Sequence, residues 1–187
     1  MPAEPAYVQK MVPLLTAEDL LQPHIPEHAD LVRGVLVVRE PPGFRHAEIT
    51  ARLTTALSMF VNAHDLGLIL AGDPGFHIAS DPDTVRGPDI AFVRRERLPH
   101  PSPAGFARFA PDLAIEIMSP SDRPGETLAK VADWLSAGTR LVWVIDPDRR
   151  LARIYRSDGS ESVLGDSAML DGEDVIMGFA CPLGTML

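Results

Sequence analysis

The sequence contains a single cysteine, Cys181, among its 187 residues. One cysteine excludes a disulfide within the chain and any zinc site built from several cysteines, and it is typical of a protein from a reducing compartment. No segment approaches the roughly 20 apolar residues of a membrane-spanning helix, and the first residues lack the basic start and apolar run of a secretory signal. We therefore expect a cytoplasmic protein with no membrane partner, in which Cys181 is an inert packing residue.

Lysine is also scarce, because Lys10 and Lys130 are the two lysines among 17 basic residues. Against 26 acidic residues this gives a net charge of −9, which disfavours a polyanion-binding protein that uses a broad basic surface but does not exclude a nuclease. Two arginine clusters, near residues 94–97 and 149–156, are interpreted as solvated surface. Lys130 is of more interest, since a partly buried lysine is a compact charge donor with an adaptable pKa.

The length and an apolar content of 45% fit one globular domain with a sizeable core over residues 1–187. We divide it into an N-terminal extension (1–30), a core (about 31–160) and C-terminal edge strands (161–187). The expected class is α/β.

The most informative stretch runs from residue 111 to 146 and predicts a strand, a loop, a helix and a second strand. In the first strand, Leu113, Ile115 and Ile117 alternate with residues of the opposite face. Glu116 is the anomaly there, because an ionised carboxylate among apolar neighbours costs several kcal/mol unless a cation, a donor or a metal offsets it.

The following helix is expected to start with Ser121 or Asp122 as its N-cap, to have Pro124 in its first turn and to end before Gly138. Lys130 lies off its predicted apolar stripe, beside Glu126 and Trp134, and helical side chains lean toward the N-terminus. We therefore expect Lys130 to reach back over the strand that contains Glu116. The predicted stripe comprises Leu128, Val131, Ala132 and Leu135.

The apolar run at 141–145 predicts a buried strand parallel to 113–118. Residues 151–156 are expected to form a strand that pairs with 141–145. Other patterns predict a short helix at 16–21, a hairpin or bent strand at 31–38, a helix at 44–64 and a strand at 90–93. Strands at 68–71 and 76–79 are expected to form a hairpin across the sequence GDPG. Residues 81–87 are expected to form a turn, and 162–164 and 175–177 edge strands.

Asp89 stands at the head of the strand 90–93, immediately after a Gly-Pro turn. Its simplest interpretation is an aspartate that stabilises its own turn. Together with Glu116 and Lys130, however, it also supplies what hard-metal hydrolysis of phosphodiesters requires, since Mg²⁺ needs one or two carboxylates and uses substrate oxygens as well. The carbonyl of Ile117 is a further candidate ligand, and His46 and Glu48 are candidates to complete the site.

At these positions the sequence resembles the Uma-two family of restriction-endonuclease-like proteins, within the PD-(D/E)xK nuclease superfamily. The resemblance is carried by Pro88-Asp89, by Glu116 in its apolar strand, by SPSD at 119–122 followed by Lys130, and by WVIDP at 143–147. It implies a restriction-endonuclease-like α/β core, with a central mixed sheet flanked by helices, and a divalent metal.

The resemblance also implies roles for individual residues. Asp89 and Glu116 would be metal ligands, Lys130 the catalytic lysine and His46 an accessory catalytic residue. One position departs from the superfamily pattern: Met118 stands where the lysine usually follows the acidic strand residue by two positions. Lys130 is therefore assigned the role of the lysine.

We accordingly expect a Mg²⁺- or Mn²⁺-dependent endonuclease that hydrolyses DNA, with a homodimer as a possible assembly. One alternative is a catalytically inactive relative that keeps the fold as a nucleic-acid or protein binding module. Another is a sugar hydrolase in which Glu116 and Asp89 form an acid/base pair, which would work in EDTA and require a raised carboxyl pKa.

Overall fold

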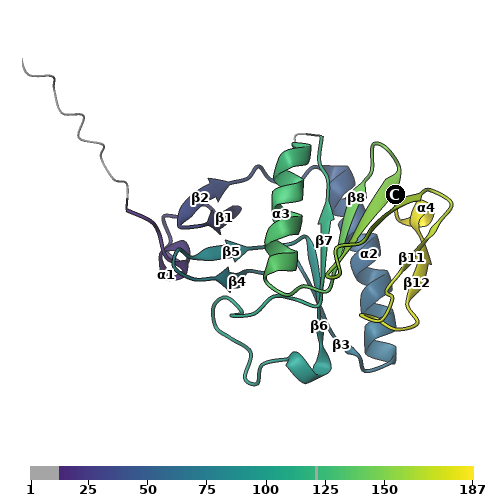
Figure 1. Ribbon diagram of the computed structural model, residues 1–187, viewed down its shortest axis with the longest axis horizontal. Helices are drawn as coiled ribbons and strands as arrows, with labels where there is room; N and C mark the ends of the chain where they lie inside the picture. The colour runs from purple at the N-terminus through teal and green to yellow at the C-terminus, as the bar shows by residue number, and fades with distance from the viewer. Residues whose placement is uncertain (1–12, 121) are drawn as a thin grey trace, which may run out of the picture.

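The computed structural model describes residues 13–120 and 122–187 of the chain (Figure 1). Its helices are α1 Ala17–Leu20, α2 Phe44–Ala63, the 3₁₀ helix η1 Arg95–Arg97, α3 Pro124–Ser136 and α4 Leu183–Met186. Its strands are β1 Ala29–Val32, β2 Val35–Val38, β3 Gly67–Ala71, β4 Phe76–Ala79, β5 Thr84–Arg86, β6 Ile90–Arg94, β7 Leu113–Ile117, β8 Leu141–Asp146, β9 Leu151–Arg156, β10 Glu161–Gly165, β11 Met169–Asp171 and β12 Ala180–Pro182.

A six-stranded mixed sheet in the order β10-β9-β8-β7-β6-β3 forms the centre of the molecule. The β7 and β8 strands are parallel, as the crossover through α3 requires, and the other neighbours are antiparallel. Helices flank this sheet, and the α/β class expected from the sequence is confirmed.

The two faces of the sheet belong to two apolar clusters, and β7 contributes to both. Leu113, Ile115 and Ile117 pack in the cluster that contains the buried stripe of α2. Ala114 packs in the cluster that contains Trp134 of α3. The alternation predicted for this strand is confirmed, and it places Glu116 on the α3 side of the sheet.

A second sheet in the order β2-β1-β5-β4 lies beside α3, at the left of Figure 1. A small cluster of Ala17, Leu31 and Val85 joins it to α1. The predicted short helix and its capping threonine are confirmed, since Thr16 and Asp19 form a capping box. The predicted hairpin at 31–38 is also confirmed, with Gly34 at a φ of 75° in the turn.

The predicted hairpin between 68–71 and 76–79 is wrong. β3 pairs with β6 in the central sheet, whereas β4 pairs with β5 in the smaller one. The glycine and proline residues between them carry the chain from one sheet to the other, because turn-forming residues specify a change of direction and not a pairing partner. The predicted turn at 81–87 likewise contains the short strand β5.

Two further local predictions are wrong. Residues 175–177 form a turn and not an edge strand, whereas β10 is the edge strand expected near 162–164. The N-cap residue of α3 is Arg123 and not Asp122, whose carboxylate instead accepts a hydrogen bond from the Ser119 amide. The other candidate for that cap, Ser121, lies outside the described residues.

The apolar stripe predicted for α3 is right only in part. Val131 is buried and Leu135 packs against the same apolar cluster, whereas Leu128 is 52% exposed. The buried face also includes Trp134, so it is rotated toward Lys130 relative to the predicted stripe. In the described part of the chain, no helix is long and apolar enough to cross a membrane.

Candidate active site

The antiparallel pairing of β6 with β7 brings the two acidic candidates together. Ile90 lies opposite Ile115, so the next step along the pair places Asp89 opposite Glu116. The charge of Asp89 acts to raise the pKa of Glu116, as expected for neighbouring carboxylates. Residues 27 positions apart in sequence therefore share one end of the β6–β7 pair.

Asp89 is held by one backbone amide and one imidazole. Its Oδ2 accepts a hydrogen bond from the Ile117 amide at 2.6 Å, and its Oδ1 lies 3.1 Å from His46 Nε2. His46 lies in the first turn of α2, and its side chain and that of Asp89 are each 11% exposed. Asp89 therefore does more than stabilise its own turn, because it ties β7 and α2 together.

Hydrogen bonding to Asp89 changes the titration of His46. Burial acts to lower the pKa of His46, but the hydrogen bond and the negative charge of Asp89 outweigh it and leave the pKa raised. Protonated His46 is thus favoured while Asp89 carries its charge.

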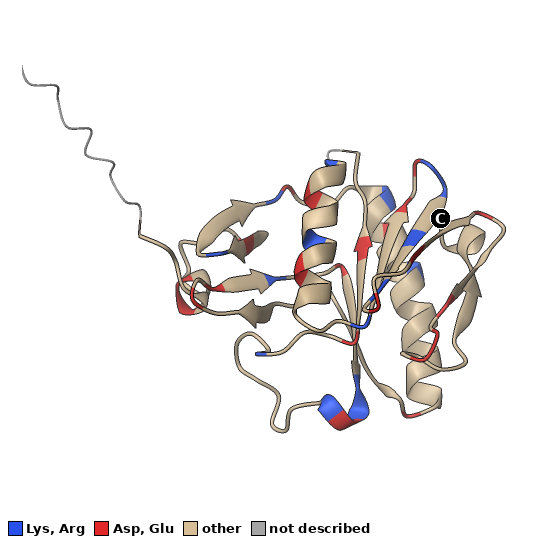
Figure 2. Cartoon of the chain, in the orientation of Figure 1, with Lys and Arg blue, Asp and Glu red and all other residues tan. Residues whose placement is uncertain are grey.

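Glu116 is buried, and α3 supplies a donor for each of its oxygens. Lys130 Nζ donates to Oε2 at 2.8 Å, and Trp134 Nε1 donates to Oε1 at 2.9 Å. The two donors are four residues apart and therefore lie on one face of the helix. In Figure 2 the blue band on α3 lies level with the red segment of β7.

Burial raises the pKa of Glu116, and the positive charge of Lys130 opposes that rise. For Lys130, burial acts to lower the pKa, but the charge of Glu116 overcomes it and leaves the pKa of Lys130 raised. Lys130 is therefore held as an ammonium ion, and its charge opposes the effect of burial on Glu116.

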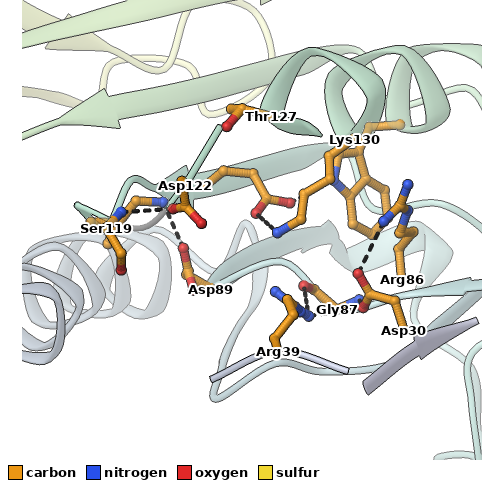
Figure 3. A network of polar contacts seen from close by, with 12 residues as sticks. Asp30, Arg39, Arg86, Gly87, Asp89, Ser119, Asp122, Thr127 and Lys130 are labelled. Carbon is orange, nitrogen blue, oxygen red and sulfur yellow. Dashed lines mark hydrogen bonds and ion pairs between the residues drawn. The ribbon is translucent and has the colours of Figure 1, made fainter. Parts of the chain in front are cut away.

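A second group of charged side chains connects α3 to the smaller sheet. Arg86 of β5 donates to Asp133 of α3 at 2.5 Å and to Asp30 of β1 at 3.1 Å. Arg39, just after β2, donates to the other oxygen of Asp30 at 2.8 Å. Figure 3 shows Arg86, Asp30 and Arg39 along the side of the site opposite Asp122. Because Asp133 lies between Lys130 and Trp134 in sequence, this network also fixes the helix that presents them.

The oxygen donors of the site suit a hard divalent ion. Asp89 and Glu116 supply two carboxylates, and the Ile117 carbonyl belongs to the residue whose amide already binds Asp89. Each carboxylate oxygen can accept more than the one hydrogen bond described above. The described residues contain no group of three or more His, Cys, Asp and Glu side chains placed to hold a metal. This set does not suit structural zinc, but it fits Mg²⁺ or Mn²⁺, which retain waters and need one or two protein carboxylates.

The sequence identified some residues of this site and missed others. It selected His46, Asp89, Glu116 and Lys130, and the structure brings these together. Glu48 lies elsewhere, because its exposed carboxylate pairs with Arg52 on the outer side of α2. The sequence predicts that Trp134 lies beside Lys130 but indicates no role for it, although an indole is a natural donor to a buried carboxylate. Asp30, Arg39 and Arg86 were missed, since no local pattern indicates contacts between β1, β2, β5 and α3.

Comparisons with known proteins agree with this architecture. Residues 17–184 match the family Uma2, which is described as "Putative restriction endonuclease". The fold is similar to that of a crystal structure described as a putative nuclease belonging to DUF820, from Anabaena variabilis ATCC 29413, with a TM-score of 0.81. That match has 20% sequence identity and covers 92% of this chain and 97% of the other. No curated protein matches the sequence.

Proposed function

The chain belongs to the Uma2 family of restriction-endonuclease-like proteins, and from this membership and the geometry around Glu116 we propose that it is a metal-dependent endonuclease that hydrolyses DNA. The single observation that carries the proposal is the buried contact between Glu116 and Lys130, 2.8 Å long, one strand away from Asp89. This arrangement combines two carboxylates with one ammonium in the same place. Mg²⁺ or Mn²⁺ is the proposed cofactor.

In this proposal Asp89, Glu116 and the Ile117 carbonyl hold the ion. A divalent ion bound by such ligands lowers the pKa of a water molecule and offsets negative charge on a phosphate. Asp89 is kept in place by the Ile117 amide and by His46, so the ligand is oriented before the substrate arrives. Glu116 is oriented in the same way by Lys130 and Trp134.

Lys130 takes the role that a lysine at position 118 would have in the superfamily. Met118 lies at that position and packs against the α3 side of the sheet. The ammonium of Lys130 reaches Glu116 from the helix, and its 19% exposed side chain is open enough to meet a substrate. We assign Lys130 to stabilise negative charge on the reacting phosphate and to orient the attacking nucleophile.

His46 is assigned an accessory role, because its ring holds Asp89 and not the phosphate.

We further propose that residues 1–187 act as one domain. Two copies would associate as a homodimer, because cutting both strands of a DNA duplex requires two active sites.

The proposal is tested by incubating supercoiled plasmid DNA with the protein in Mn²⁺ or Mg²⁺. We expect nicked and linear products that disappear in EDTA. Lys130→Met is expected to lower the cleavage rate by about 10²-fold or more while keeping a cooperative thermal transition, since losing one charge-stabilising donor typically costs that much. Glu48→Gln, an exposed change on α2, serves as the control and should cleave like the wild type.

A binding module without catalysis is the second candidate, and the hydrogen bonds that Glu116 already accepts favour it. Both carboxylate oxygens already accept a hydrogen bond, so the residue is satisfied without an ion. This candidate predicts DNA or protein binding with no cleavage in any metal. Full cleavage activity in Lys130→Met would remove the role given to that lysine.

A sugar hydrolase is favoured by one observation, the raised pKa of Glu116 that burial produces. A carboxylic acid with a raised pKa is what such an enzyme needs as its acid. Hydrolysis of a glycoside in EDTA, without any nucleic-acid cleavage, would favour it over the nuclease.

A further inference from the structure

Arg39 extends from the smaller sheet to the edge of the active site. It follows the last residue of β2, and its Nη2 donates to Asp30 Oδ1 at 2.8 Å and to the Gly87 carbonyl at 3.2 Å. Gly87 lies two residues before Asp89 on the segment that leads into β6. The guanidinium is therefore anchored to the same stretch of backbone that positions the aspartate.

The remaining donors of Arg39 are not used within the described residues. A guanidinium has five N–H groups, and the two contacts above use only those of Nη2. The Nε atom is buried and has no hydrogen-bond partner in the described residues. Nη1 also makes no hydrogen bond within the described residues, but it is not among the buried atoms, so its two N–H groups are available to a ligand. The side chain is 25% exposed, so a ligand can approach it from solvent.

The need to neutralise the charge of Asp30 does not by itself explain why Arg39 lies at the edge of the site. The second oxygen of Asp30 already accepts from Arg86 Nη1 at 3.1 Å, and Arg86 is itself buried. The charge of Arg39 instead acts on the active site, because it interacts with the charges of Glu116 and Asp89. It also interacts repulsively with the ammonium of Lys130. Figure 3 shows the Arg39 guanidinium between Asp30 and Asp89, on the side facing Lys130.

We propose that Arg39 binds the phosphodiester that is cut, with its free Nη1 donating to a non-bridging oxygen of that phosphate. This inference rests on the proposed nuclease function and adds the residue that recognises the substrate anion. Arginine suits the task because Nη2 can stay bound to Asp30 and the Gly87 carbonyl while Nη1 donates to the phosphate, whereas the Lys130 ammonium acts as a point charge. The negative charges of Asp89 and Glu116 would repel a phosphate. The positive charges of Arg39 and Lys130 offset that repulsion.

The test measures binding without cleavage. A short fluorescein-labelled DNA duplex is titrated with protein in EDTA, and anisotropy is recorded over a series of salt concentrations. We expect Arg39→Gln to weaken binding by about tenfold and to reduce the slope of log K against log salt by about one, as the loss of one phosphate contact predicts. Arg39→Lys keeps a charge that can pair with Asp30 but has no second nitrogen to donate to the phosphate, and we expect it to weaken binding severalfold with an unchanged thermal midpoint.

Arg33→Gln is the matched control, because Arg33 lies in the turn of the same β1–β2 hairpin but is 74% exposed, and its ion pair with Asp133 is 4.0 Å long. We expect less than a twofold change. Wild-type affinity and salt slope in both Arg39 variants, or no DNA binding by the wild type, would overturn the inference. If the wild type binds DNA through Arg39 but cuts no nucleic acid in Mg²⁺ or Mn²⁺, the nuclease proposal fails and Arg39 remains an anion-binding residue.

Discussion

At the scale of single residues, Glu116 shows how a buried charge determines its surroundings. The sequence indicated that a carboxylate in an apolar strand needed a compensating partner, and Lys130 was selected for its scarcity and position. The structure adds Trp134, whose indole donates to the second oxygen at 2.9 Å. This contact was not predictable from hydrophobic spacing, since a tryptophan on a helix facing a sheet is ordinarily only a packing residue.

Trp134→Phe tests the value of that hydrogen bond. Removing the indole leaves Glu116 Oε1 buried without a partner, and we expect the free energy of unfolding to fall by about 1–3 kcal/mol beyond the loss of packing. Urea denaturation followed by circular dichroism measures it.

Trp143→Phe is the matched control, because its indole N–H is buried and has no hydrogen-bond partner in the described residues. It removes a similar volume but no hydrogen bond. Equal losses of stability in the two variants would show that the contact with Glu116 contributes nothing.

The pair formed by His46 and Asp89 predicts a pH dependence. The pKa of His46 is raised in the folded protein, because the contact with Asp89 outweighs burial, so protonation stabilises the fold. This contribution is complete below the ordinary histidine pKa of about 6.5 and disappears as the pH rises through the raised value. We expect His46→Gln in EDTA to lower the free energy of unfolding more at about pH 5.5 than at about pH 9. A difference that is the same at both pH values, or that grows with pH, would contradict this assignment.

At the scale of elements, local patterns predicted most helices and strands but not all of their pairings. The helix at 44–64 is confirmed as α2, and the parallel pair formed by 113–118 and 141–145 is confirmed as β7 and β8. The alternation of a strand and the stripe of a helix are encoded locally, so they can be recognised from sequence. The residues of β6 that pair with β3 are 19 to 27 positions away in sequence, and the turn residues that follow β3 gave no information about them.

The orientation of α3 was predicted only in part. Val131 and Leu135 of the predicted stripe pack toward the sheet, but Leu128 is exposed and Trp134 is buried in its place. The hydrogen bonds that Lys130 and Trp134 make to Glu116 orient this face together with the apolar packing, and a stripe based on hydrophobicity alone omits them.

Two substitutions in α3 test this orientation. Val131→Ala removes buried methyl groups and is expected to lower the free energy of unfolding by about 1–2 kcal/mol. Leu128→Ala removes more side chain but from an exposed position, and we expect a change within about 0.5 kcal/mol. Thermal or urea denaturation of both variants gives the comparison. A larger cost for Leu128→Ala would mean that the other face of the helix is buried.

At the scale of the whole molecule, the site lies where the two sheets meet α3. The central sheet supplies Asp89 and Glu116, the helix supplies Lys130, and the smaller sheet supplies Arg39. Arg86 joins these parts, since its guanidinium binds both Asp30 of the small sheet and Asp133 of the helix. The family resemblance gave the order of the acidic and basic motifs, but contacts between sheets depend on the complete fold and were not visible in the sequence.

The net charge of −9 makes the local grouping of positive charge at the site important for binding a phosphate. Figure 2 shows basic and acidic segments interspersed along the elements. A molecule of this charge gains little from general attraction to a polyanion, so contacts concentrated at one site must bind the phosphate. A divalent ion, Lys130 and Arg39 are the proposed contributors of positive charge.

The most direct test of the account is whether Asp89 and Glu116 together bind a divalent ion. The thermal midpoint of the metal-free protein is measured with increasing Mn²⁺ for the wild type, for Asp89→Asn and for the control Glu48→Gln, which changes an exposed carboxylate that pairs with Arg52. An ion that binds only the folded state stabilises it by about 2.7 kcal/mol at a hundred times its Kd. We predict that Mn²⁺ raises the midpoint of the wild type and of Glu48→Gln by several degrees and leaves that of Asp89→Asn unchanged. An equal rise in all three proteins, or none in the wild type, would contradict the metal site.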